Sequence, residues 1–199
     1  MRTIMRDFCN FRYVAEILKA VRLPRCRCAL AVCGLVLAGL PTARAQDLEF
    51  GFAAGMGSEN TEFSHGVAVD SVGNVYMGGY FRGRADFDPG AGTAFVTSAG
   101  DADAYLQKLD SSGNLVWVKT FSGPENIFGY AVMVDNLGNA YLAGSFSGTA
   151  DFDPGAGVTQ FTASGSDAFI VKLSSSGALG WARKMGSADT EVVLGIAVD

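Results

Sequence analysis

The sequence predicts an all-β fold built from repeated four-stranded antiparallel sheets. Its landmarks recur at intervals of 64 to 65 residues, as segments 67–70, 132–135 and 196–199 show. Each interval contains short runs rich in Val, Tyr, Phe, Leu and Trp, separated by turns that contain glycine. In a run such as 167–173, both alternating sets of side chains are largely apolar. A small sheet that is apolar on both faces must stack between neighbours, as the blades of a β-propeller do.

Residues 1–45 have the order of a secretory signal peptide. A basic cluster that ends at Arg27 precedes the apolar run 29–40, and Ala43-Arg44-Ala45 then forms an A-x-A cleavage pattern ahead of Gln46. The apolar run is shorter than the roughly 18 to 20 residues that a membrane-spanning helix requires. We therefore expect cleavage after Ala45, a secreted or cell-surface protein, and no transmembrane anchor once the signal is removed.

Charge and composition exclude several classes of function. Residues 1–45 hold eight Lys/Arg and two acids, a formal charge of +6, whereas residues 46–199 hold seven Lys/Arg and eighteen acids, a charge of −11. An acidic mature chain repels phosphate backbones, so nucleic acid is not an expected partner. All four cysteines lie within the first 33 residues and His65 is the only histidine. This excludes a disulfide scaffold and a paired-histidine zinc motif within this chain.

The strands of the first full repeat are expected at 66–70, 74–81, 103–109 and 115–121. Turns at 71–74 and 111–114 contain Gly and Asn, which favour hairpin connections. Segment 52–57 precedes Asp70 at the same distance as 181–186 precedes Asp199, so it is interpreted as another copy of the fourth strand. The expected organisation is a signal peptide at 1–45, an outer strand of a preceding blade plus linker at 46–65, repeats at 66–130 and 131–194, and the start of a third repeat at 195–199.

Four motifs recur in the same order: Gly-x-Ala-Val-Asp, Gly-Asn-x-Tyr, Asp-Ala-[Tyr/Phe]-x-x-Lys-Leu and Ser-Ser-Gly-x-Leu-x-Trp. In these motifs the chain resembles the bacterial SBBP-type beta-propeller repeat family, from about Asp47 to Asp199. The resemblance implies a propeller in an exported bacterial protein, and it transfers no catalytic residue set. Because a closed ring typically has 4 to 8 blades, we expect an incomplete ring here, with the remaining repeats downstream of Asp199.

The most chemically suggestive feature is an Asp-x-Asp pair, Asp86 and Asp88, that is repeated as Asp151 and Asp153. Alternate residues of an extended segment point to one side, so each pair places two hard oxygen ligands together, and calcium is the candidate ion. The interpretation we favour is a turn, in which proline and glycine shape the backbone and aspartate accepts backbone hydrogen bonds, with calcium binding as the alternative. The segment is interpreted as an insertion between the second and third strands. No other cofactor is expected.

Three further residue types have structural interpretations. His65 stands where the other copies have Tyr130 and Leu194, so a packing or loop role is expected. Trp117 and Trp181 are expected to contact neighbouring blades, with sugar stacking as the alternative. The aspartates that end the first strand are expected to accept turn hydrogen bonds, with cation binding as the alternative; they are Asp70, Asp135 and Asp199.

Regular repeats without an isolated reactive constellation favour a platform over an enzyme. The sequence therefore predicts a secreted, non-enzymatic propeller that acts as a binding or scaffold module at or beyond the cell envelope, with a protein or glycan ligand. The alternative is part of a propeller hydrolase or lyase that acts on polysaccharide, with its active site in blades outside this chain. No catalytic residue is assigned.

Overall fold

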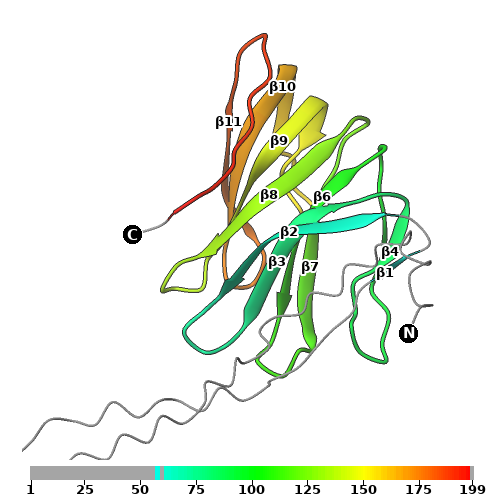
Figure 1. Ribbon diagram of the computed structural model, residues 1–199, viewed down its shortest axis with the longest axis vertical. Helices are drawn as coiled ribbons and strands as arrows, with labels where there is room; N and C mark the ends of the chain where they lie inside the picture. Colours follow the sequence, from blue (N-terminus) through cyan, green and yellow to red (C-terminus); the bar gives the residue numbers. More distant parts are fainter. Residues whose placement is uncertain (1–56, 59–60, 198–199) are drawn as a thin grey trace, which may run out of the picture.

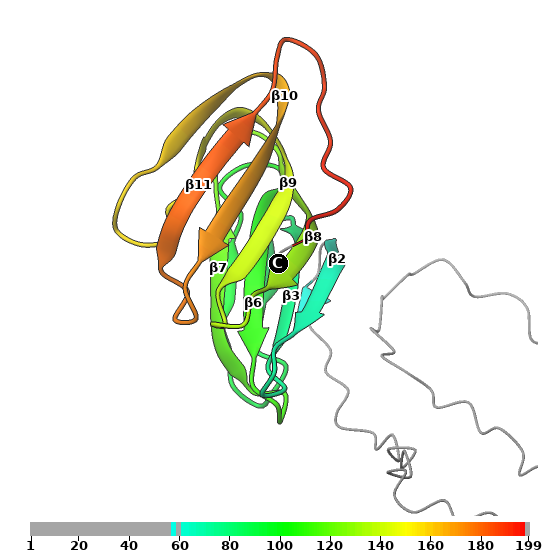
Figure 2. The same cartoon turned by 90° about the vertical axis from the view of Figure 1, so that its left-hand side faces the viewer.

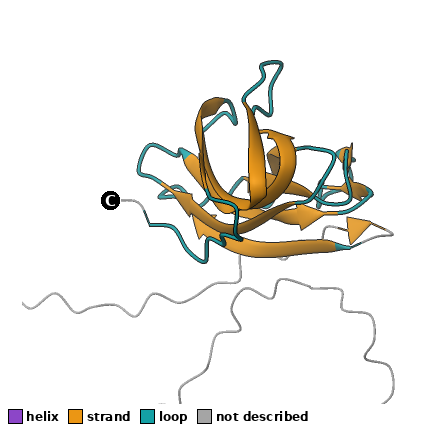
Figure 3. Cartoon of the chain, turned by 90° about the horizontal axis from the view of Figure 1, so that it is seen from above, coloured by secondary structure: helices purple, strands orange, loops and turns teal. Residues whose placement is uncertain are grey.

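The computed structural model describes residues 57–58 and 61–197, and their backbone forms strands and loops (Figure 3). The predicted signal peptide and most of the predicted outer strand lie outside these residues. The strands are β1 (Gly57–Ser58), β2 (Glu62–Val69), β3 (Val75–Phe81), β4 (Arg84–Asp86), β5 (Phe95–Thr97), β6 (Asp103–Leu109), β7 (Leu115–Phe121), β8 (Ile127–Val134), β9 (Ala140–Asp151), β10 (Gln160–Leu173) and β11 (Leu179–Met185).

Two four-stranded antiparallel sheets contain most of these strands (Figure 1). The first, blade 1, has the order β2-β3-β6-β7, and the second, blade 2, has the order β8-β9-β10-β11. Figure 2 shows the first strands β2 and β8 at one edge of the pair and the last strands β7 and β11 at the opposite edge. This arrangement confirms the predicted all-β fold of four-stranded, propeller-type blades.

The second, third and fourth strands of blade 1 lie at or within one residue of their predicted positions. The first strand instead begins at Glu62, four residues before the predicted start at Gly66. It extends because Glu62 still pairs with Phe81, while a register shift between Ser64 and Gly66 interrupts the ladder. Such a β-bulge inserts an extra residue that breaks the apolar alternation, which hides the start of the strand in the sequence.

Both predicted hairpin turns of blade 1 are present. Gly73 and Gly113 adopt φ values of 89° and 85°, the left-handed region in which a residue with a Cβ atom is strained. The backbone N–H of each glycine donates to the carbonyl of the aspartate that opens the turn, Asp70 and Asp110, at 3.1 and 2.9 Å. These bonds confirm the predicted turn chemistry.

The insertion between the second and third strands extends each blade on one side. In blade 1 it forms separate strands β4 and β5, which pair with each other, and β4 also pairs with β1. In blade 2 it is continuous with the long strands β9 and β10. Gly57 of β1 pairs with Asp86 of β4, and Ser122 forms the matching bridge to Asp151. The segment after one fourth strand is thus held by the insertion of the following blade. We call this pairing the interblade clamp.

The main hydrophobic core lies between the two blades. One face of blade 1 contributes Tyr76, Leu106 and Phe121, which pack with side chains from the facing side of blade 2. Their partners in blade 2 include Ile127, Val132, Leu142, Phe146, Phe152, Phe169, Val171 and Leu173. The alternate residues of β3 and β6, such as Phe81 and Tyr105, are buried in two smaller clusters on the other face. Because both faces are covered, the apolar runs have no strictly polar alternate set.

Glycines permit a close approach of the blades at their first strands. A Cβ atom on Gly66 would lie 2.6 Å from the backbone nitrogen of Val132, and one on Gly78 would lie 2.6 Å from the Val132 side chain. On the other side, a Cβ atom on Gly129 would lie 2.7 Å from the carbonyl oxygen of Gly79. The spacing of the inner strands therefore depends on positions that have no side chain.

We predict that Gly66→Ala lowers the free energy of unfolding by about 1–3 kcal/mol, because the added methyl group overpacks the contact with Val132. Denaturant titration measures this change. Gly195→Ala is the control, since a Cβ atom there meets nothing within 4 Å, and it should change stability by less than about 0.5 kcal/mol. Equal effects of the two substitutions would show that the close approach is not what constrains the blades.

Candidate functional site

The four predicted metal-ligand residues lie in the two insertion loops. The Oδ1 atom of Asp86 accepts backbone hydrogen bonds from Asp88 at 3.1 Å and Ala94 at 2.7 Å, and Asp88 Oδ1 accepts one from Gly90 at 2.8 Å. Blade 2 repeats the pattern: Asp151 Oδ1 accepts from Asp153 and Thr159 at 2.9 and 2.8 Å, and Asp153 Oδ1 accepts from Gly155 at 2.8 Å. The predicted turn role accounts for these contacts.

The residue between the two aspartates anchors each loop in the core. Phe87 and Phe152 are 1% and 0% exposed, and their rings lie edge-on to Phe81 and Phe146 at centroid distances of 5.2 and 5.1 Å. Asp-Phe-Asp is therefore an alternating segment with one buried aromatic between two polar residues. Sequence reasoning about the aspartates missed this anchor, although the same alternation is its signal.

The described residues contain no group of three or more His, Cys, Asp or Glu side chains arranged to hold a metal ion. Both Asp-x-Asp segments use one oxygen of each carboxylate to order the loop backbone. Calcium binding at Asp86, Asp88, Asp151 and Asp153 stays a prediction.

Asp70 and Asp135 form the same hydrogen-bonded turn in the two blades. Asp135 Oδ1 accepts the backbone N–H groups of Leu137 and Asn139 at 3.0 and 2.9 Å, and its Oδ2 accepts from the Asn139 side chain and the Tyr141 hydroxyl at 2.8 and 3.1 Å. Asp70 makes the equivalent four bonds. The predicted turn role of these two residues is confirmed, while Asp199 lies outside the described residues.

The surroundings of Asp135 favour its ionised form. Burial alone would raise its pKa, but the hydrogen bonds from Asn139, Tyr141 and Leu137 outweigh burial and lower the pKa to about 2. The Lys172 ammonium lies 3.5 Å from Asp135 Oδ2 and over the ring of Tyr141. The carboxylate is thus part of a structural network at the end of the blade.

Two further acids are buried at matching positions of the third strands: Asp103 at the start of β6 and Asp167 within β10. Asp167 pairs with Lys184, whereas the matching position beside Asp103 holds Thr120. Asp103 accepts a hydrogen bond from the backbone N–H of Ala99 at 2.8 Å, and burial raises its pKa. The two blades therefore solve the same desolvation problem in different ways.

The two tryptophans contact turns and tyrosines. Trp117 lies edge-on to Tyr76 at 6.1 Å, and its indole Nε1–H donates to the carbonyl of Ser175 in blade 2 at 3.1 Å. The predicted contact between blades is therefore confirmed for Trp117. Trp181 lies edge-on to Tyr141 of its own blade at 6.2 Å.

Aromatic rings from both blades gather on β2 and β3 of blade 1 and on β8 of blade 2. The register shifts that define the bulges leave His65 and Tyr130 as the extra residues of β2 and β8. Their rings meet edge-on at 5.6 Å, and His65 also stacks on Tyr80 at 5.6 Å. His65 is exposed and packs as predicted. The cluster, which we call the aromatic ridge, consists of Phe63, His65, Tyr80, Phe128 and Tyr130.

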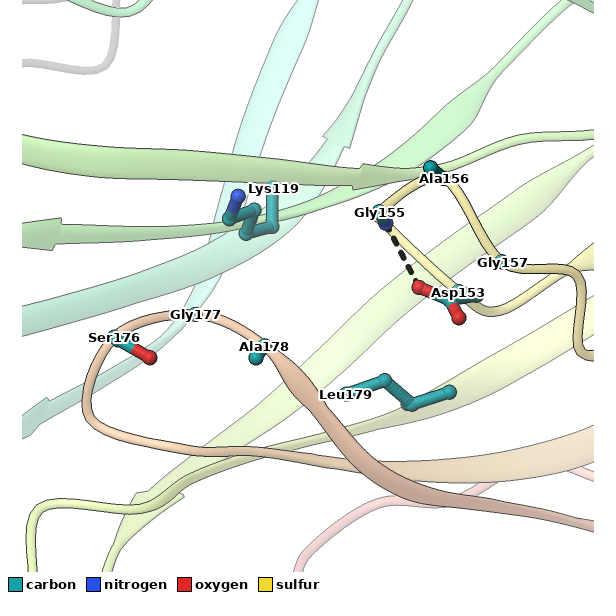
Figure 4. A pocket seen from close by; sticks show the side chains of 9 residues that line it. All are labelled: Lys119, Asp153, Gly155, Ala156, Gly157, Ser176, Gly177, Ala178 and Leu179. Carbon is teal, nitrogen blue, oxygen red and sulfur yellow. Dashed lines mark hydrogen bonds between the residues drawn. The ribbon is translucent and has the colours of Figure 1, made fainter.

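A pocket of about 360 Å³ lies between the last strand of blade 1 and two loops of blade 2 (Figure 4). It brings Asp153, one of the predicted ligand residues, into the same cavity as Lys119 of β7. Sequence reasoning missed this pocket, because its walls come from three separate segments of the chain that belong to two different blades. Its lining residues are Lys119, Asp153, Gly155, Ala156, Gly157, Ser176, Gly177, Ala178 and Leu179.

Comparisons with known proteins agree with the fold. Residues 49–80 and 116–152 match the model of the SBBP beta-propeller repeat. The second segment begins in β7, the fourth strand of blade 1, and ends just after β9, the second strand of blade 2. An uncharacterized WD repeat-containing protein of Acanthamoeba polyphaga mimivirus is 23% identical over 196 residues, an alignment that covers 83% of this chain. The chain spans 14% of the length of that curated relative. No helix long and apolar enough to cross a bilayer occurs in the described part of the chain.

We predict that Asp135→Asn reduces the loss of stability in acid. The folded pKa of about 2 lies below the unfolded value of about 3.9, so the ionised carboxylate stabilises the fold above about pH 4. That contribution disappears as the pH falls through about 2. Melting temperatures measured from pH 5 to pH 2 should fall more steeply for the unmutated protein than for Asp135→Asn. Tyr141→Phe, which removes one donor, should be intermediate, and parallel curves for all three would contradict the assignment.

We predict that Asp151→Ala lowers the free energy of unfolding by about 1–3 kcal/mol, because two backbone N–H groups lose their acceptor. Asp151→Asn retains an acceptor oxygen and should cost less than half as much. Calorimetry with calcium and with a chelator tests the metal prediction on the same proteins. If calcium binds these aspartates, it should raise the melting temperature of the unmutated protein, and it should do so less after Asp151→Asn combined with Asp153→Asn. No effect of calcium on the unmutated protein would contradict the metal prediction.

Proposed function

We propose that this chain, which carries beta-propeller repeats of the SBBP family, is a secreted, non-enzymatic module that binds a protein partner through the aromatic ridge. The repeat architecture and the distant WD repeat-containing relative support a repeat and binding module. The proposal that the module binds a protein partner depends on which parts of the repeat are the same in both blades and which differ. The single observation behind it is the aromatic ridge.

The frame of each blade is constant, whereas the aromatic ridge varies. The aspartate turns and the insertion loops have the same hydrogen bonds in both blades. The bulge position of the first strand, in contrast, is His65 in blade 1 and Tyr130 in blade 2, and its match in the partial third copy is Leu194. A bulge redirects a side chain without changing the strands around it. The residue at each bulge can therefore differ between blades without altering the fold, and its identity can be matched to a ligand.

The chemistry of the aromatic ridge suits a protein interface. Tyrosine and other aromatic residues are enriched at interface cores, because they bury a large area with few rotatable bonds. Burial raises the pKa of Tyr80, which leaves its hydroxyl protonated as a hydrogen-bond donor at neutral pH. Arg82, two residues further along, pairs with Asp101 at 3.3 Å and adds a polar border.

A binding role is favoured over catalysis because the acidic groups already have structural partners. Asp70, Asp135 and the insertion aspartates accept turn hydrogen bonds, and the single histidine packs on aromatic rings. Secretion is supported by the basic cluster, apolar run and A-x-A pattern of residues 1–45. Together these features favour an exported platform at or beyond the cell envelope.

We predict that a photoreactive benzoylphenylalanine at position 65 cross-links the exported protein to a discrete partner. Tyr80→Ser should reduce that adduct, because it removes one ring of the aromatic ridge. The variant should still fold, since serine stands at the matching position 145 of blade 2. The control places the cross-linker at position 137, an exposed turn residue that is 82% accessible. Mass spectrometry of the exported protein should find Gln46 as its first residue.

The two readouts fail separately. Equal adducts at positions 65 and 137, or none at 65, would contradict binding through the aromatic ridge. An exported protein that retains residues 1–45 would contradict the signal peptide and leave the binding result unaffected.

A further inference from the structure

The pocket between the blades has charged and apolar walls, and its volume is that of a small-molecule site. Figure 4 shows Lys119 on one side and the loop 153–157 on the other, with the turn at Ser176 to Ala178 closing a third side. Its volume of about 360 Å³ lies in the range of small-molecule sites, roughly 300–1,000 Å³. The aromatic ridge contributes no residue to this lining.

The two charges in the pocket belong to different blades and are not paired with each other. Lys119 has no carboxylate of the described residues within ion-pair distance, and neither has Asp153 a cationic partner there. Asp153 uses Oδ1 for the backbone of Gly155, and its Oδ2 lies beside Gly157. The pocket thus offers a cationic donor on one wall and an acceptor oxygen on another.

Glycines keep the space between these groups open. A Cβ atom on Gly157 would lie 2.2 Å from Asp153 Oδ2, and one on Gly177 would lie 2.7 Å from Lys119 Cε. Any side chain at either position would therefore displace the charged group beside it. Ala156, Ala178 and Leu179 supply small apolar surfaces between the charges.

We propose that this pocket binds a sugar unit of a neutral glycan. A hydroxyl group can donate a hydrogen bond to the Asp153 carboxylate and accept one from the Lys119 ammonium, so neighbouring hydroxyls on one ring satisfy both charges. The C–H faces of the same ring match the alanine and leucine surfaces. A neutral ligand also suits a pocket whose two charges cancel.

The repeat pattern favours a polymer as the source of the sugar. Loop 88–92 has the same sequence as loop 153–157, and Arg183 of β11 stands where Lys119 stands in β7. A further blade with the same insertion loop, packed against β11, would therefore repeat the site, whereas the boundary ahead of loop 88–92 has Ala54 in place of the basic residue. Weak sites at a regular spacing gain avidity for a chain of repeated units.

The test is affinity electrophoresis of the full chain through gels that contain dextran, mannan or galactomannan. At least one polysaccharide should retard the unmutated protein. Asp153→Asn and Lys119→Gln should each weaken that retardation at least about tenfold in apparent Kd, since each removes one charged partner of the hydroxyls. Asparagine at position 153 retains the acceptor for Gly155, and unchanged melting temperatures verify that the variants fold.

Asp88→Asn is the matched control. Asp88 makes the same loop bond to Gly90 at 2.8 Å, but the residue that matches Lys119 ahead of that loop is Ala54, which has no charge. This variant should therefore change the apparent Kd by less than about twofold. Retardation by none of the three polysaccharides, or equal losses for Asp88→Asn and Asp153→Asn, would overturn the proposal. Displacement by free glycine would also overturn it, because the pocket would then bind a zwitterion instead. Cross-linking at position 65 is read independently of these results.

Discussion

The close approach of the first strands of the two blades is the constraint on which the rest of the structure depends. Gly66, Gly78 and Gly129 remove the side chains that would separate the blades at this edge. Larger side chains from both blades, such as Phe121 and Phe146, fill the core between the two sheets. Packing of this kind is sensitive to single methyl groups, since protein interiors are filled to the density of organic crystals. The aromatic ridge lies on the same strands, where His65 and Tyr130 are the bulge residues of β2 and β8.

Hydrogen bonds to aspartate, rather than packing, fix the ends of the blades. Each Asp-x-x-Gly-Asn turn uses one carboxylate to satisfy several donors, and each insertion loop repeats the device with a second carboxylate. The buried Phe87 and Phe152 then join these polar loops to the core. Residues 46–199 carry a formal charge of −11, and many of their carboxylates accept hydrogen bonds from the chain's own backbone. This use of the acids explains why an acidic composition does not by itself indicate a metal or substrate site.

Local patterns in the sequence were sufficient for the strands and turns, and insufficient for the surfaces between blades. The turn at Gly73 and the strands 103–109 and 115–121 depend on neighbouring residues, so periodicity and turn chemistry predicted them. The start of β2 was missed because a bulge breaks the alternation near His65. The pocket at Lys119 and the aromatic ridge join residues of different blades, and no pattern within one repeat contains that relation. The sequence analysis singled out the two Asp-x-Asp pairs, but the role of the phenylalanine between the aspartates became clear only from its burial in the structure.

The interblade clamp bears on how such proteins change length during evolution. Gly57 pairs with Asp86 and Ser122 pairs with Asp151, so each clamp joins residues on both sides of a blade boundary and recurs every 65 residues. If a gene duplication or deletion spans one whole period, each residue of a clamp still has a matching residue to pair with, wherever within the period the recombination occurs. The stretch 116–152, one of the two matched by the family model, contains both residues of one clamp, Ser122 and Asp151. The unit that can be copied is thus any stretch one period long, whichever residue it begins with. The number of blades can change in this way while the interblade clamps are kept.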